Sequence, residues 1–167
     1  MLRRHIVLIG LLAAILPGAE PGPAQRAFGE LKKLEGEWKG TTGGGEAVAV
    51  SYRLTAGGTV LMEDFEFAGK KGSRMTTMYH LDGERILLTH YCMAGNQPRM
   101  AATVSSAGAT TLDFQFIDAT NLTSPDAGHM HHAVIRLLGP DRLQSAWTYR
   151  KDGRDNHTET FEYKRVR

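Results

Sequence analysis

The feature that most constrains this fold is a series of short alternating runs that occupies most of the 167-residue chain. Polar and apolar residues alternate within each run, the period expected of a half-buried β-strand. Counting "EWKGTT", there are about ten runs, separated by turn-forming stretches such as "TAGG", "AGKKG" and "KDGRD". No helical pattern of 10–15 residues interrupts the series, which argues against a parallel sheet built from βαβ units.

Short breaks between consecutive strands favour antiparallel neighbours, and closure of the sheet removes its exposed edges. The sequence therefore predicts an all-β fold, an antiparallel up-and-down β-barrel of about ten strands with a short N-terminal helix across one end. The helix is indicated by Phe28, Leu31, Leu34 and Trp38, which recur at three- to four-residue spacing and predict an end near Gly36.

The N-terminus carries the features of a signal peptide. A basic "MLRRH" precedes the apolar run "IVLIGLLAAIL", and "PGAEPGPA" follows with small and helix-breaking residues. The run is shorter than the ~20 apolar residues of a membrane span. We predict a signal peptide over 1–24, cleaved after Ala19 or Ala24, and an exported barrel domain over 25–167 without a stable membrane span. An uncleaved membrane anchor is the alternative.

Charge and cysteine content exclude other classes. Loss of residues 1–24 removes two arginines and one glutamate, which lowers the formal net charge from +2 to +1. A nearly neutral domain without a basic stripe gives no argument for nucleic acid. Cys92 is the single cysteine, so no intramolecular disulfide forms and the exported domain depends on its hydrophobic core.

Strand alternation predicts which side chains face the barrel interior. In "HLDGER", a two-residue Asp82-Gly83 turn would pair Met75 with His90 and place His80 and His90 on opposite faces. In "TVLMEDFEF", the face with the larger apolar content holds Leu61, Glu63, Phe65 and Phe67. Turning this face inward buries the Glu63 carboxyl, which is costly unless that group is paired.

Two later stretches extend the predicted interior. In "HMHHAVIRLL", Arg136 marks the outer face, so alternation turns His129 and His131 inward and His132 outward. For the last hairpin we prefer a three-residue loop with a bulge over a two-residue Asp152-Gly153 turn, because the bulge gathers the aromatic residues on one side. That side would hold Trp147, Tyr149, His157, Glu159, Phe161 and Tyr163.

The stretch "FGELKKLEGEWKG" resembles the entry of the calycin superfamily, in which a short helix leads to a Gly-x-Trp on the first strand and then to a meander of eight to ten strands. The motif falls here on Gly36 and Trp38. Lipocalins, fatty-acid-binding proteins and nitrobindin-like haem barrels share this plan, and the likeness in layout covers roughly residues 28–165. "YHLDGERILLTHYC" and "GNQPRM" are also similar to an uncharacterised group of exported bacterial proteins. In nitrobindin-like barrels the axial histidine lies late in the chain, where "HMHH" and His157 compete.

An apolar interior with a polar minority is typical of a barrel that holds one small ligand. We predict that such a ligand binds through His90, His129 and His131, which would orient its polar head. Tyr79 and Glu63 would support them from the interior. Arg99, in the loop region "AGNQPRM", would pair a ligand carboxylate at the barrel mouth.

Three alternatives remain open at the level of sequence. His90, His129, His131 and Glu63 match the ligand types of a zinc or iron site, which would make the protein a metal-dependent hydrolase or isomerase. Haem bound through one imidazole is a second alternative. It would be non-covalent, because the sequence has no Cys-x-x-Cys-His attachment motif. The third is a filled core in which the histidines only bond their neighbours. No catalytic motif supports an enzyme over a binding protein.

Overall fold

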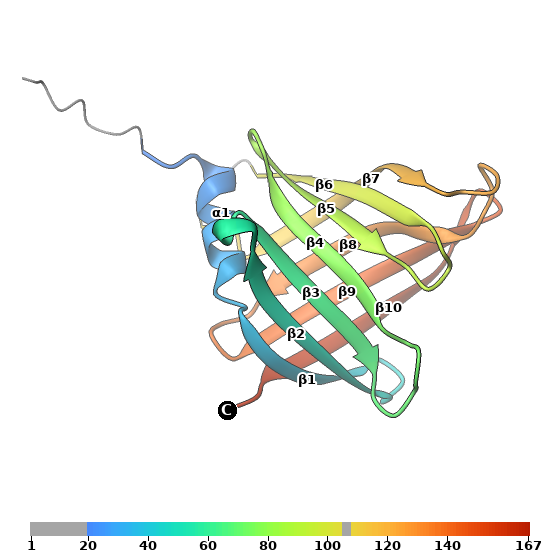
Figure 1. Cartoon of the computed structure of the whole chain (residues 1–167), viewed down its shortest axis with the longest axis horizontal. Coiled ribbons are helices and arrows are strands. Elements are labelled where there is room, and N and C mark those ends of the chain that lie inside the picture. The colour runs from blue at the N-terminus through green and yellow to red at the C-terminus, as the bar shows by residue number, and fades with distance from the viewer. Residues whose placement is uncertain (1–19, 105–107) are drawn as a thin grey trace, which may run out of the picture.

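The computed structural model describes residues 20–104 and 108–167, in which ten antiparallel strands close into one barrel (Figure 1). Each strand pairs with its neighbours in the chain, and β1 pairs with β10 to complete the closure. The predicted up-and-down barrel of about ten strands is therefore confirmed. The strands are β1 (Gly36–Thr42), β2 (Ala47–Thr55), β3 (Val60–Phe67), β4 (Met75–Asp82), β5 (Arg85–Tyr91), β6 (Gln97–Thr103), β7 (Thr111–Thr120), β8 (His129–Leu137), β9 (Arg142–Lys151) and β10 (Arg154–Arg165).

The turn between β4 and β5 lies one residue later than the sequence predicts. Gly83 and Glu84 form it, and Gly83 has a φ of 60° at the first central position, as in a type II′ turn. The register therefore pairs Thr77, rather than Met75, with His90. Because this shift equals two residues, the inner and outer faces stay as predicted, and the buried His90 lies on the inner one.

The turn between β9 and β10 combines the two geometries considered for it. Asp152 and Gly153 form a two-residue turn with φ of 54° and 68°, and an irregularity between Asp155 and His157 shifts the register further along the strand. The preferred three-residue loop was wrong, but the bulge has the predicted consequence. It brings six side chains to one face, where all of them line the same cavity: Trp147, Tyr149, His157, Glu159, Phe161 and Tyr163.

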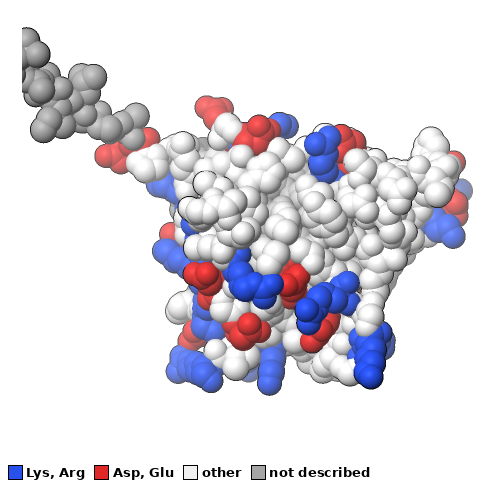
Figure 2. Space-filling model, in the orientation of Figure 1, with Lys and Arg blue, Asp and Glu red and all other residues white. Residues whose placement is uncertain are grey.

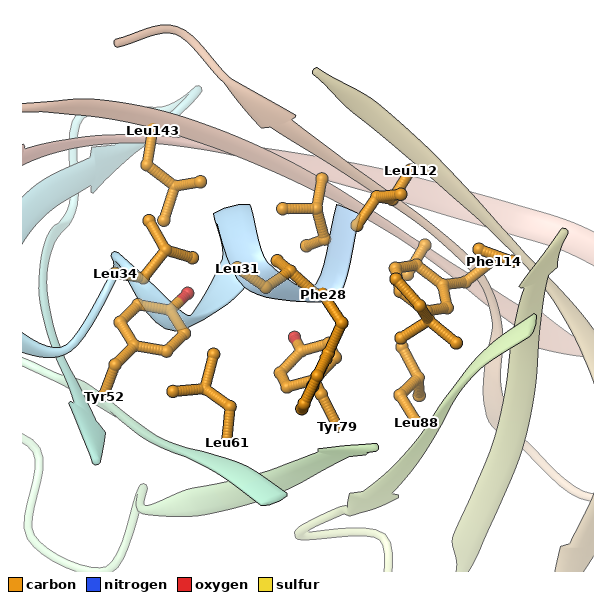
Figure 3. Close-up of a cluster of buried hydrophobic side chains, with 14 of the residues drawn as sticks. Phe28, Leu31, Leu34, Tyr52, Leu61, Tyr79, Leu88, Leu112, Phe114 and Leu143 are labelled. Carbon is orange, nitrogen blue, oxygen red and sulfur yellow. The ribbon is translucent and has the colours of Figure 1, made fainter. Parts of the chain in front are cut away.

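Helix α1 (Pro23–Lys32) lies across one end of the barrel (Figure 1). Its buried face carries Ala24, Ala27, Phe28 and Leu31. Figure 3 shows Phe28 and Leu31 pointing into the barrel among side chains from the surrounding strands. This end is consequently packed solid, with Tyr52, Leu61, Tyr79, Leu88, Leu112, Phe114 and Leu143 buried around the helix.

The helix ends earlier than its hydrophobic spacing predicts. It stops at Lys32 rather than near Gly36, and Trp38 lies in β1, as the Gly-x-Trp pattern predicts. After Lys32 the backbone tightens, since the nitrogens of Leu34 and Glu35 donate to carbonyl oxygens three residues back. The carbonyl oxygen of Leu34 accepts a 2.7 Å hydrogen bond from the indole nitrogen of Trp38. The Trp38 indole thereby supplies a hydrogen-bond donor to one of the backbone carbonyl groups at the end of the helix, which have no donor within the helix.

Arg165, at the end of β10, fastens the helix end to the barrel. Its guanidinium lies 4.3 Å from the ring centre of Trp38 and donates to the carbonyl oxygens of Lys33, Glu35 and Pro140. One side chain thus joins the first strand, the last strand and the segment that follows α1.

The predicted signal peptide falls largely on residues outside the described part of the chain. Its second cleavage position, Ala24, lies within α1 and is buried, whereas cleavage after Ala19 would leave α1 whole. Across residues 20–104 and 108–167, no helix has the length and apolar content of a membrane-spanning segment. Figure 2 shows Lys and Arg interspersed with Asp and Glu on the visible face, in keeping with the small net charge.

Candidate functional site

The barrel is hollow at the end away from α1, where a cavity of about 380 Å³ lies between the strands. Leu61, near the start of β3, packs at the helix end, whereas Phe67 at the end of the same strand lines the cavity. Met93 lines the cavity from the turn after β5 and is 55% exposed, so the cavity reaches the surface there. Most of its wall is aromatic or aliphatic, from Phe65, Phe67, Met75, Met130, Trp147, Tyr149, Phe161 and Tyr163.

A row of polar side chains crosses the inner surface of four adjacent strands. The register pairs Tyr52 with Glu63, Glu63 with Thr77, and Thr77 with His90. Directly opposed residues of an antiparallel pair point to the same face of a sheet. All four side chains are at least 95% buried, and Glu63 and His90 line the cavity. Alternation along β3 predicted the inward Glu63 correctly, since Leu61 and Phe65 on the same face are buried as well.

Glu63 is a carboxyl group without a cationic partner among the described residues. Tyr79 donates a 2.7 Å hydrogen bond to its Oε2. Burial raises the pKa of Glu63 to about 7, although hydrogen bonding to Tyr79 and Tyr52 acts in the opposite direction. Its neighbour Asp64 faces the outer surface and pairs with Arg53 at 2.7 Å. A substantial fraction of Glu63 therefore carries a proton at neutral pH.

His90 is the second polar group of the cavity. Its Nδ1 lies 2.9 Å from Thr77 Oγ1, and its ring packs on Trp147 with 4.9 Å between ring centres. Nε2 is buried and has no hydrogen-bond partner in the described part of the protein. Burial lowers the pKa of His90 to about 4, so the imidazole is neutral at pH 7. A buried nitrogen without a partner is a group that a bound ligand can satisfy.

His129 and His131 form a separate cluster that does not line the cavity. His129 Nε2 lies 3.1 Å from His131 Nδ1, and both rings pack on Phe116. Arg150 contacts the other ring nitrogen of His131. Burial is the largest cause lowering the pKa of His131, and the positive charge of Arg150 lowers it further.

A bulge in β8 explains why these histidines depart from the predicted pattern. The β8–β9 register shifts between Met130 and His132, which leaves one extra residue in β8. Strict alternation places Met130 outside, yet Met130 lines the cavity opposite Tyr149, itself a lining residue. His132 pairs with Asp113 at 2.8 Å.

The remaining predicted residues lie beside or outside the cavity. Tyr79 is buried beneath it and acts through Glu63. Arg99 is exposed, forms an ion pair with Asp118 and is not a lining residue. Among residues 20–104 and 108–167, no three His, Cys, Asp or Glu side chains are close enough together to hold a metal ion.

The structure adds two residues that sequence reasoning missed. Thr77 positions His90, and its role depends on a register that the type II′ turn at Gly83 sets. Gly83 was the signal for this register in the sequence, because glycine is favoured at the first central position of a type II′ turn. Met130 enters the wall through the β8 bulge, for which "HMHH" contains no turn-forming residue.

Comparison with solved structures shows the same kind of fold elsewhere. The chain is similar to the crystal structure of Rv2717c from M. tuberculosis, with a TM-score of 0.61 and 17% identity over 84% of this chain and 98% of that one. A protein of unknown function from the DUF3598 family of Nostoc punctiforme also matches, with a TM-score of 0.46 and 15% identity over 92% of this chain and 53% of that one. No family model matches the chain, and no curated protein matches it significantly.

Proposed function

We propose that this protein is exported and binds a small, largely apolar ligand in the cavity, as calycin-like barrels do. The observation that carries the proposal is the 380 Å³ cavity, whose wall is mostly aromatic and aliphatic with a few polar groups. Binding sites for small molecules have this composition, in which polar groups orient a ligand that apolar contacts hold. His90 and Glu63 are buried polar residues that line the cavity and are placed to orient it.

N-phenyl-1-naphthylamine is a suitable probe, because it is neutral and apolar and its fluorescence rises on leaving water. We expect saturable binding of one molecule per chain. Met130→Trp should weaken that binding at least tenfold by filling the cavity from its wall. The matched control is Ile117→Trp, which changes an exposed residue outside the cavity wall. Equal affinity in the wild type and in Met130→Trp, or no saturable binding to either, would refute the cavity as the site.

Non-covalent haem is a second candidate, and the observation that favours it is His90, which lines an apolar cavity and whose buried Nε2 has no hydrogen-bond partner among the described residues. A neutral imidazole of this kind fits the role of an iron ligand. The cavity wall, as far as the structure describes it, offers no Lys or Arg to pair a propionate. A haemin titration decides between the candidates: a Soret shift that His90→Leu abolishes supports haem, and an unchanged haemin spectrum rejects it.

Export rests on the N-terminal sequence, and cleavage after Ala19 is the better expectation because α1 then stays intact. N-terminal sequencing of the protein recovered outside the cytoplasm tests this directly. A mature chain beginning at Glu20 supports the proposal. A full-length chain that stays in the cytoplasm contradicts it.

A further inference from the structure

The charged groups of the cavity have one sign. Its described wall contains two carboxyl groups, from Glu63 and Glu159, and no lysine or arginine. Of its two histidines, His90 is neutral at pH 7 because burial lowers its pKa to about 4. His157, at the exposed rim, contacts Glu159 at 3.1 Å. The interior therefore offers a ligand negative charge and no fixed positive charge.

Glu63 differs from Glu159 in what already surrounds it. Glu159 accepts a 2.9 Å hydrogen bond from the backbone nitrogen of Gly43 and has His157 beside it. Glu63 is 95% buried, and its neighbours are the phenols of Tyr79 and Tyr52, which donate hydrogen bonds but carry no charge. A buried carboxylate without a counter-charge is costly. The fold nevertheless keeps an ionisable carboxyl group here, at the inner wall of the cavity.

Aromatic rings surround the space in front of this carboxyl group. The cavity wall includes Phe65, Phe67, Trp147, Tyr149, Phe161 and Tyr163. The faces of such rings attract ammonium groups, and several of them around one cation form a recognised binding arrangement for organic amines. Aromatic faces therefore compensate part of the hydration that an ammonium loses on entering the barrel.

We infer that the cavity selects an organic cation: a small amine with an apolar body, whose ammonium group lies against the Glu63 carboxylate. This inference rests on the proposed ligand-binding function and names the chemical class of the ligand. The amine supplies the charge partner that Glu63 lacks, and the apolar body occupies the aromatic part of the cavity. A ligand with a carboxylate head, such as a fatty acid, meets like charge and no cationic partner, so the site discriminates against it.

Binding of such a ligand couples to the protonation of Glu63. Its pKa lies near 7 in the free protein, and a cation beside it favours the ionised form. An amine that is fully charged at these pH values should therefore bind more tightly as the pH rises from 6 to 8, and should displace up to one proton near pH 7. The other titratable groups around Glu63 are Tyr52, Tyr79 and Tyr163, with Asp64 on its own strand and His90, Cys92, Tyr149, His157 and Glu159 along the same cavity. Burial raises the pKa of Tyr52, Tyr79 and Tyr163 well above 10, so these phenols stay neutral over that range.

Three ligands with the same eight-carbon chain test the selectivity: octylamine, 1-octanol and octanoate. Each competes with N-phenyl-1-naphthylamine at pH 8. We expect octylamine to compete at a concentration at least tenfold below that of 1-octanol, and octanoate to compete least well. Octanoate competing as well as octylamine would overturn the inference.

Two matched variants locate the carboxyl group responsible. Glu63→Gln should retain binding of the fluorescent probe and of 1-octanol but lose the preference for octylamine. Glu159→Gln should keep that preference. A preference that survives Glu63→Gln, or that disappears only in Glu159→Gln, would contradict the assignment to Glu63. Calorimetry of octylamine binding in two buffers of different ionisation enthalpy should show proton release near pH 7 in the wild type and none in Glu63→Gln.

These outcomes separate the inference from the proposed function. Binding of the probe and of 1-octanol without any preference for the amine refutes the inference alone. Failure of the probe, the alcohol and the amine to bind refutes both.

Discussion

The Tyr79 hydroxyl donates a 2.7 Å hydrogen bond to the Glu63 carboxyl at the boundary between the packed and the hollow parts of the barrel. Tyr79 packs beneath the helix among the core residues of Figure 3, whereas Glu63 lines the cavity. This contact connects the structural core with the candidate site, so a change at Glu63 should be measurable in both stability and binding.

Glu63→Gln should make the protein less sensitive to a rise in pH. The pKa of Glu63 is raised to about 7 in the folded protein from an ordinary value of 4.5, so its protonated form favours folding. The stabilising contribution is full below about pH 4.5 and is lost as the pH rises to about 7. Above pH 7, Glu63→Gln should exceed the wild type in unfolding free energy by on the order of 3 kcal/mol, since one pKa unit corresponds to about 1.4 kcal/mol.

Urea unfolding of both proteins at pH 5 and pH 8 measures this difference. The expected result is a larger gain from the substitution at pH 8 than at pH 5. An equal effect of Glu63→Gln at both pH values would show that the carboxyl group does not titrate between them in the folded state.

His90→Leu should have the opposite pH signature. Burial lowers the pKa of His90 to about 4 from 6.5, so its neutral form favours folding. Its contribution is present above about pH 6.5 and is lost as the pH falls to about 4. In the wild type, the fall in unfolding free energy at low pH caused by His90 is partly offset by the opposite pH dependence of Glu63. The effect of His90→Leu should therefore be clearest when the double variant Glu63→Gln/His90→Leu is compared with Glu63→Gln.

The substitution also leaves the Thr77 hydroxyl without its partner, which costs on the order of 1 kcal/mol at pH 7. Unfolding free energies at pH 4.5 and pH 7 provide the test. If His90→Leu leaves the loss of stability at acidic pH unchanged, the assignment of that loss to His90 is wrong.

Arg165→Lys should be strongly destabilising for a conservative change. The guanidinium stacks on Trp38 and donates to three carbonyl oxygens, and a lysine ammonium cannot reproduce that planar set of contacts. We expect a loss of roughly 2 kcal/mol in unfolding free energy, from the stacking and the hydrogen bonds together. Arg167→Lys, at a more exposed arginine that contacts Asp141, serves as the control and should change little. Similar losses for both variants would refute the role given to Arg165.

Gly40→Ala should destabilise the protein at the pairing of β1 with β10, which closes the barrel. A Cβ at this position would lie 2.1 Å from the backbone oxygen of Glu162 and 2.7 Å from the ring of Tyr163, so the paired strands would have to separate. Gly29→Ala is the matched control, because no atom lies within 4 Å of its Cβ position in α1 and alanine favours a helix by about 1 kcal/mol. Thermal unfolding should show a lower midpoint for the first variant and a higher one for the second. An unchanged midpoint for Gly40→Ala would show that β1 and β10 do not approach each other closely at Gly40.

Much of the fold followed from local patterns in the sequence. Alternation along β3 placed Glu63 inside because each strand has a two-residue period. For the same reason, the register error of two residues at the Gly83 turn still left His90 on the inner face. Bulges are different, because one extra residue changes the pattern beyond it. The β8 bulge separates His129 and His131 from the cavity wall and brings Met130 into it. Its position depends on pairing with β9, which a single strand sequence does not encode.

The most direct test of the central claim is diffraction from crystals of the wild-type protein soaked with bromobenzene, with the bromine located by its anomalous signal. We predict a bromine peak inside the barrel, at the end away from α1, in contact with Phe65, Trp147 and Phe161. A peak found solely on the outer surface, around an interior filled by side chains, would contradict the account.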